Sequence, residues 1–271
     1  MKNLTIQSSR EWVRYFRCNG LVAMRVPWHL GADLQPDERR AIAHSIRVFQ
    51  LGESSEGRHL MRYARQWAGR ADDCAYAEAI RMLIAEEQRH AAALARFMEM
   101  NGIARLKSGF SDRVFRRLRN MFGTLEVSLA VLVTAEIAAK TYYPAIGAAT
   151  NSVVLRAIFE QIHRDEIAHV EFQTGQLARM RAGRSRVGLW ITATMHRALF
   201  YPTAVVVAIS HHVALRRGGL GFWAFLRKSR HQFLFDLAAM DPRHRDLVER
   251  PTSRHPAEPM TLASSAPIRW S

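Results

Sequence analysis

Hydrophobic residues recur every three or four positions through most of the chain, a spacing that predicts amphipathic α-helices and no β-strands. The four longest stretches of this kind predict helices over 37–68, 74–101, 124–149 and 152–182. A short turn at 69–73 follows the first helix, so the second should lie antiparallel beside it. We expect the basic segment 103–122 to form a long crossover. Together these features predict an all-α protein built on an antiparallel four-helix bundle over 36–183.

The segments on either side of the bundle differ in composition and predict helical extensions. Residues 1–35 place aromatic residues among arginines, which predicts a short basic helix that packs on the bundle or lies on a membrane. Residues 184–240 are apolar and basic. Within them, 188–215 favour a packed or interfacial helical hairpin over a transmembrane helix, because Pro202 and two histidines interrupt the apolar run. Residues 241–271, with five prolines, predict a mostly disordered tail.

Acidic residues and histidines interrupt the apolar stripe of each predicted bundle helix. They are Glu53 and Glu56 in the first helix, Glu87 and His90 in the second, Glu136 in the third, and Glu166 and His169 in the fourth. The second and fourth helices therefore repeat one motif, Glu-x-x-His. Because residues i and i+3 share a helix face, the Glu and the His of each copy point the same way. One copy is common by chance, but two copies on matching faces are a specific signal.

The glutamates also match in depth along the predicted helix pairs. In an antiparallel pair, residues that face each other lie at equal distances from the connecting turn. Glu53 and Glu87 are centred on position 70, inside the first turn, and Glu136 and Glu166 are centred on position 151, at the second. We therefore expect these four side chains to converge at one level of the bundle.

Carboxylates inside a helical bundle need protonation, pairing or a metal, because an ionised carboxylate is costly to bury. Two divalent ions would balance four carboxylates, and two neutral histidines would complete the donor set. Such donors suit iron or manganese better than metals that prefer thiolates. The candidate ligands of a two-iron or two-manganese site are Glu53, Glu87, His90, Glu136, Glu166 and His169. The alternative is a metal-free bundle with salt-bridged polar layers.

Two acidic residues that directly precede candidate glutamates could support the site from outside. A metal-bound histidine usually donates its second ring N–H to a carboxylate. Asp165 could hold His90, and Glu86 could hold His169, across the bundle. The alternative for both acidic residues is a place at the surface.

The roles of two further residues stay open at this point. Glu56, one turn after Glu53, is a seventh ligand, a proton relay or a polar residue at the edge of the bundle. His163, one turn before Glu166, either approaches the metals or lies outside the ligand set.

The paired motifs, together with the first-helix run from Phe49 to Arg58, resemble the ferritin-like superfamily of di-iron carboxylate proteins, which includes rubrerythrins, bacterioferritins and di-iron hydroxylases. The resemblance covers roughly 37–182. It implies a ferritin-like bundle with two iron ions, and an oxidoreductase that activates O2 or peroxide with electrons from an external donor. A hydrophobic or membrane-borne substrate is a further implication. The alternatives are an iron-handling ferroxidase or storage protein, and a metal-free membrane-associated scaffold.

The charge distribution bears on possible partners. The formal net charge is +15, yet residues 36–180 carry 20 basic and 17 acidic residues, whereas the flanks carry 19 and 7. This excess favours contact with an anionic membrane surface or nucleic acid, or it is solvated surface charge. No phosphate-binding loop or nucleic-acid module is recognisable, so we expect no specific nucleic-acid partner. A homodimer stays open.

Cysteine usage and the N-terminus bear on location. Two cysteines, Cys18 and Cys74, argue against a disulfide framework and against a cysteine-ligated metal site. The first residues lack the apolar region of a secretory signal. We therefore expect a cytoplasmic protein, with peripheral contact at the inner face of the membrane as an open option.

Overall fold

A computed structural model describes residues 8–21, 24–54, 57–109 and 123–243. These residues form helices and connecting segments without a β-strand, which confirms the predicted all-α class for this part of the chain. The elements are α1 (Ser9–Leu21), η1 (Trp28–Leu30), α2 (Pro36–Glu53), α3 (Arg58–Ala71), α4 (Cys74–Met100), α6 (Leu125–Ala148), α7 (Val153–Arg181), α8 (Arg186–Ser210), α9 (His212–Arg217) and α10 (Phe222–Ala239).

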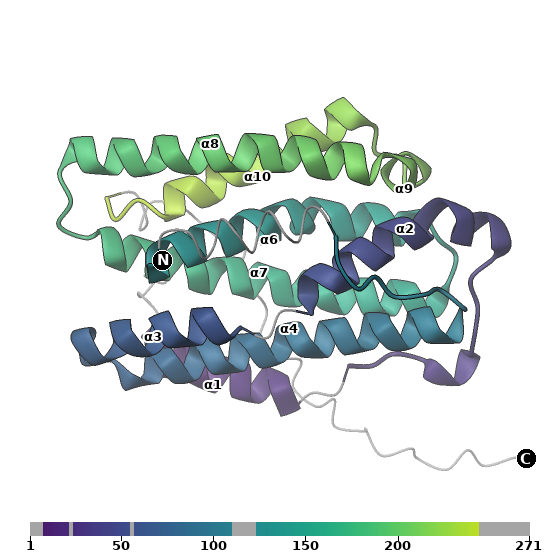
Figure 1. The fold of residues 1–271 in the computed structure, drawn as a ribbon, viewed down its shortest axis with the longest axis horizontal. Helices are drawn as coiled ribbons and strands as arrows, with labels where there is room; N and C mark the ends of the chain where they lie inside the picture. The colour runs from purple at the N-terminus through teal and green to yellow at the C-terminus, as the bar shows by residue number, and fades with distance from the viewer. Residues whose placement is uncertain (1–7, 22–23, 55–56, 110–122, 244–271) are drawn as a thin grey trace, which may run out of the picture.

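The long helices lie along the length of the molecule, with α6 and α7 in the middle (Figure 1). α4 packs against α7 and also contacts α1, α2 and α3. On the other side, α8 and α10 pack against α6. The helices expected to form the bundle are thus covered by α1 at one side and by α8 to α10 at the other. Most of the predicted crossover, 110–122, lies outside the described residues, and a ferritin-like topology stays a prediction.

Side-chain caps fix where three of the long helices begin. Asp73 precedes α4, Thr124 precedes α6 and Ser152 precedes α7, and each side chain accepts a hydrogen bond from a backbone N–H of the first turn. Such caps satisfy N–H groups that have no partner within the helix. Because each helix starts at a fixed residue, the polar positions near its middle have a fixed place in the core.

The first predicted helix is wrong as a single element, because α2 and α3 are separate helices. α2 ends at Glu53, and Gly57 has a φ of 64° immediately before α3. A Cβ atom on Gly57 would lie 2.6 Å from the side chain of Ile84, so a larger residue fits neither the backbone nor the space. The apolar spacing continues across this break, which hid it from the sequence. Glu56 lies within the break, outside the described residues.

The stretch 188–215 does not form a hairpin by itself. It comprises most of α8 and the start of α9, with Pro202 inside α8, and the returning helix is α10, which packs against α8. Within the described part of the chain, no helix is long and apolar enough to cross a membrane. The predicted tail falls outside the described residues beyond position 243.

A polar layer divides the hydrophobic core along the length of the molecule. On α4, Leu83 belongs to one apolar cluster and Leu94 to another. On α7, Ile162 and Phe172 likewise belong to different clusters. The buried acidic residues and histidines of both helices lie between these positions. Apolar packing therefore encloses the polar layer at both ends.

Candidate metal centre

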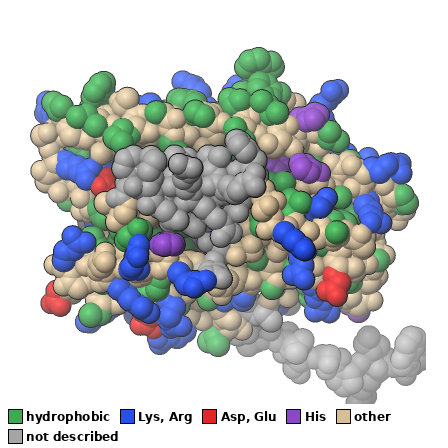
Figure 2. Space-filling model, viewed as in Figure 1, with side chains coloured by type: hydrophobic (Ala, Val, Ile, Leu, Met, Phe, Trp, Pro, Cys, Tyr) green, Lys and Arg blue, Asp and Glu red, His purple; other side chains and the backbone are tan. Residues whose placement is uncertain are grey.

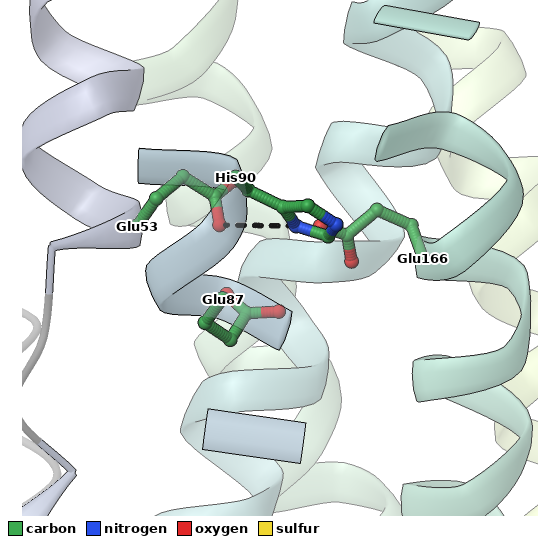
Figure 3. Close-up of side chains that lie close together, drawn as sticks. All are labelled: Glu53, Glu87, His90 and Glu166. Carbon is green, nitrogen blue, oxygen red and sulfur yellow. Dashed lines mark ion pairs between the residues drawn. The ribbon is translucent and has the colours of Figure 1, made fainter. Parts of the chain in front are cut away.

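Four helices supply side chains to the polar layer. Glu53 comes from the end of α2, Glu87 and His90 from α4, Glu136 from α6, and Glu166 and His169 from α7. The close-up shows four of them, with Glu53 from α2 and Glu166 from α7 reaching toward Glu87 and His90, which both come from α4 (Figure 3). The structure thus brings all six candidate ligands together.

The donors form two overlapping groups, in each of which one atom per residue lies within 4.8 Å of the others. The first group consists of Glu53, Glu87, His90 and Glu166. The second group consists of Glu87, Glu136, Glu166 and His169. Glu87 and Glu166 belong to both groups, and each group adds one further glutamate and one histidine. Two neighbouring cations that share two carboxylates would find this arrangement of donors.

Several donor atoms of the layer are buried without a well-oriented hydrogen bond within the described residues. They include Glu53 Oε2, Glu87 Oε1, His90 Nδ1, Glu166 Oε2 and His169 Nδ1. The atoms nevertheless crowd together: His169 Nδ1 lies 2.8 Å from Glu87 Oε1, and His90 Nδ1 lies 3.8 Å from Glu53 Oε2. Buried polar atoms without good partners are costly. A cation among these atoms would satisfy them, so the donor set fits a metal.

A carboxylate on the opposite helix holds each histidine from outside. His90 Nε2 lies 2.9 Å from Asp165 Oδ2, and His169 Nε2 lies 2.9 Å from Glu86 Oε2. Glu86 and Asp165 are 1 % and 5 % exposed, so neither lies at the surface. These contacts fix both rings so that Nδ1 faces the glutamates, where it can bind a metal once it has lost its proton.

Without a cation, burial and the neighbouring charges shift the pKa values of the layer strongly. Burial, aided by Glu87, raises the pKa of Glu53 to about 7, and burial raises the pKa of Glu136 to about 8 and that of Glu166 well above its usual value. Burial acts in the same direction on Glu87, but His169 overcomes it and lowers the pKa of Glu87 to about 2. The layer therefore keeps a proton on Glu136 near neutral pH and favours the protonated form of Glu166.

The pKa values of the two histidines are raised, whereas burial without a partner lowers the pKa of an imidazole. Burial alone would lower the pKa of His90, but the hydrogen bond to Asp165 and the nearby Glu53 raise it to about 9. Glu86 and Glu87 likewise raise the pKa of His169 well above its usual value, against the effect of burial. The metal-free layer thus balances charge with protons on both rings. Metal binding would release these protons, because a ligating imidazole is neutral.

α1 contributes a residue that the sequence analysis missed. Asn19 Nδ2 donates to Glu86 Oε1 at 2.7 Å and to Asp165 Oδ1 at 3.0 Å, so one amide links the two carboxylates that hold the histidines. Arg89 also donates to Glu86, and Gln161 to Asp165. No motif marks Asn19, because its position depends on how α1 packs on α4.

We expect replacement of Asn19 with alanine to weaken metal binding about 10- to 100-fold, the usual effect of losing an outer-sphere partner. Without the amide, the two carboxylates that orient the histidine rings lose a shared donor. Isothermal titration with Mn²⁺ measures the change, and Cys18→Ala, an exposed neighbour on the same helix, is the matched control. Equal affinity in the Asn19 variant and the control would show that the rings do not depend on Asn19.

Two further residues bind candidate ligands and were not identified from the sequence. Tyr143 donates its phenol hydrogen to Glu53 Oε1. Gln173 Nε2 lies 2.6 Å from each carboxylate oxygen of Glu136. Tyr143 lies on the apolar stripe of its helix, where its aromatic ring resembles any other hydrophobic side chain. Gln173 lies one turn after His169, so a search for polar residues that continue the motif would have found it.

His163 lies outside both donor groups. It is half-buried, and burial together with Lys140 and Arg164 lowers the pKa of its imidazole. Two nearby cations make this a poor place for a further metal ligand. Glu56 lies outside the described residues, and its role stays a prediction.

Solvent reaches the layer unevenly. The Glu87 side chain is 14 % exposed, whereas those of Glu166 and His169 are 1 % and 0 % exposed. Small molecules that enter the layer would therefore meet Glu87 first.

Comparisons with protein-family models, with curated proteins and with solved structures find no match to this chain. The assignment of the layer consequently rests on its own geometry.

Proposed function

We propose that the protein is a ferritin-like oxidoreductase that holds two iron ions, with manganese as the alternative metal, in the polar layer. The observation that carries this proposal is the sharing of Glu87 and Glu166 between two otherwise equivalent donor groups. Salt-bridged polar layers have no need for two matching sets of donors. In this assignment the unshared ligands are Glu53 and His90 for one ion, and Glu136 and His169 for the other.

Charge balance and donor chemistry support iron or manganese. Four carboxylates offset the four positive charges of two divalent ions, and the two imidazoles bind as neutral donors. Cys18 and Cys74 are both exposed and belong to neither donor group, so a metal that requires thiolate ligands would not find them in the layer.

Two reduced iron ions held here would supply electrons to O2 or peroxide, and an external electron donor would restore them. The surrounding residues protect and orient the ligands. Tyr143 directs its phenol proton at Glu53, and burial raises the pKa of that phenol far enough to keep it protonated. Gln173 orients Glu136, and the apolar clusters at both ends keep water away from the layer.

Iron handling without an organic substrate is the second candidate function. The enclosure of the layer favours it, because even Glu87, the candidate ligand most open to solvent, has a side chain that is only 14 % exposed. The two functions differ in the fate of the metal and in assembly. Iron that leaves the layer after oxidation, in a multimeric shell detected by size-exclusion chromatography, supports ferroxidase or storage activity. Iron that stays bound through repeated reduction and oxidation supports the oxidoreductase.

We expect the metal-free, full-length protein to bind about two Fe(II) ions per chain under anaerobic conditions, as ferritin-like carboxylate sites do. Elemental analysis after desalting measures the ratio, and a parallel loading with Mn(II) compares the two metals. Less than about one ion per chain with either metal would contradict a two-metal site.

A further inference from the structure

The outer face of α8 is apolar, although a surface helix normally turns polar residues to solvent. We define this outer face by six of the exposed apolar side chains of α8, which are Val187, Trp190, Ile191, Met195, Val205 and Ile209. Their exposed fractions run from 37 % for Val205 to 66 % for Val187 and Trp190. Their spacing places them on one side of the helix, so they form one stripe rather than scattered single residues.

The opposite side of α8 already serves the hydrophobic core. Phe200, Ala204 and Ala208 are buried there, where α8 packs against α6 and α10. α8 is thus apolar on both sides, so its outer face is not needed for packing within the chain. Figure 2 shows hydrophobic side chains along the edge of the molecule formed by α8, with lysine and arginine side chains beside them. Continuous exposed apolar surface of this kind marks an interaction site.

The exposed charged residues of α8 to α10 are all basic. The exposed basic residues of α8 to α10 include Arg186, Arg216, Arg227, Lys228 and Arg230. Asp236 is the single acidic residue between 184 and 240. It is buried and lies 3.3 Å from Lys140, so it does not offset the charge at the surface. The partner of this surface should therefore be apolar and anionic.

A pocket of about 280 Å³ opens beside the outer face, between α8 and α10. Tyr201, Trp223 and Leu226 are among the residues that line it, and Arg227 and Arg230 line it as well. Trp223 is 77 % exposed, which is unusual for the largest side chain unless it has a partner. Apolar space next to two guanidinium groups suits an acyl chain with an anionic headgroup.

We propose that the outer face of α8 and the adjoining pocket bind the anionic surface of a lipid bilayer, with α8 lying in the plane of the interface. Apolar residues would enter the headgroup region while the basic residues meet anionic lipids. Trp190, Tyr201 and Trp223 belong to the residue types that favour this region. Pairing with a second copy of the chain would instead bring the arginines of both copies together without acidic partners. Membrane binding goes beyond the metal chemistry and does not depend on it.

Vesicle flotation of the full-length protein tests this proposal. The protein should float with phosphatidylcholine vesicles that contain phosphatidylglycerol, should stay behind with phosphatidylcholine alone, and should bind less as salt increases. A triple variant, Trp190→Ser, Ile191→Ser and Ile209→Ser, should bind at least about tenfold more weakly, because it loses three apolar anchors. The matched control replaces Leu30 and Val153, which are exposed on other elements, with serine.

A second variant separates the charges from the apolar anchors. Replacing Arg227, Lys228 and Arg230 with glutamine should weaken binding to the anionic vesicles and reduce its dependence on salt. Circular dichroism verifies the fold of each variant. Equal binding to both kinds of vesicle, or equal binding by the triple variant and its control, overturns the proposal. So does a concentration-dependent dimer that the triple variant abolishes, if the wild-type protein ignores vesicles.

Discussion

Replacing Glu87 or Glu166 with alanine should prevent both metal ions from binding, whereas replacing Glu53 or Glu136 should leave one ion in place. The difference follows from the geometry, because Glu87 and Glu166 belong to both donor groups and the other two glutamates to one group each. Loss of a shared carboxylate removes a ligand from both ions and leaves three carboxylates against their four positive charges. Loss of an unshared carboxylate leaves one donor group intact.

Elemental analysis of anaerobically loaded variants measures this contrast, and Glu160→Ala is the matched control because Glu160 is an exposed acidic residue on the same helix as Glu166. We expect the control to bind about two ions, the unshared variants about one, and the shared variants none. Retention of two ions by both shared variants would refute the ligand assignment. Circular dichroism and thermal melting of the metal-free variants verify that a lost ion does not reflect a lost fold.

Most of the helices that carry the candidate ligands could be predicted because two independent signals agree at their ends. The expected helices over 74–101, 124–149 and 152–182 correspond to α4, α6 and α7 within a residue or so. Their apolar stripes are continuous, and each begins directly after a residue that caps it. The register of their polar positions was therefore readable from the sequence.

The break between α2 and α3 could not be read in the same way, because the apolar spacing runs through it unchanged. What breaks the helix is local, with a left-handed glycine, Gly57, placed against Ile84 of a different helix. A contact of this kind exists only after the helices have packed. Glu53 still reaches the layer because it ends α2 before the break.

The residues around the ligands were harder to predict than the ligands. Asn19 comes from α1, and its contact with Glu86 exists only because α1 packs on α4. The spacing of apolar residues does not predict which helices pack together in this way. Tyr143 was hidden by its aromatic ring, which suits an apolar stripe, although its hydroxyl binds Glu53. Periodicity identifies the face of a helix but not the polar atoms that meet across faces.

Glu166→Gln should make the metal-free protein more stable than the wild type by about 1–3 kcal/mol at neutral pH, and should make the metal-loaded protein less stable than the loaded wild type. Glu166 is fully buried, and burial together with Glu87 and Glu136 raises its pKa well above the usual value. Folding without metal therefore forces this carboxyl to take up a proton. The amide avoids that cost, but it cannot bridge two cations.

The difference in stability between the metal-free glutamine variant and the metal-free wild type depends on pH with a definite sign. Because the folded pKa of Glu166 is raised, the unfolded chain releases this proton above its ordinary pKa of 4.5 while the folded protein keeps it. The stability of the metal-free wild type therefore falls as pH rises above 4.5, and the stability advantage of the glutamine variant grows. Below that pH the carboxyl is protonated in both the folded and the unfolded state, so the advantage disappears.

Urea denaturation of both proteins between acid and neutral pH, with and without Mn²⁺, measures the two effects, with the exposed Glu160→Gln as control. At a free metal concentration of about 100 times the dissociation constant, the wild type should gain roughly 2.7 kcal/mol for each ion that it binds, and the variant much less. The order of the two stabilities should consequently reverse when metal is added. A salt-bridged layer without a metal gives no such reversal, because its stability would not respond to Mn²⁺ in either protein.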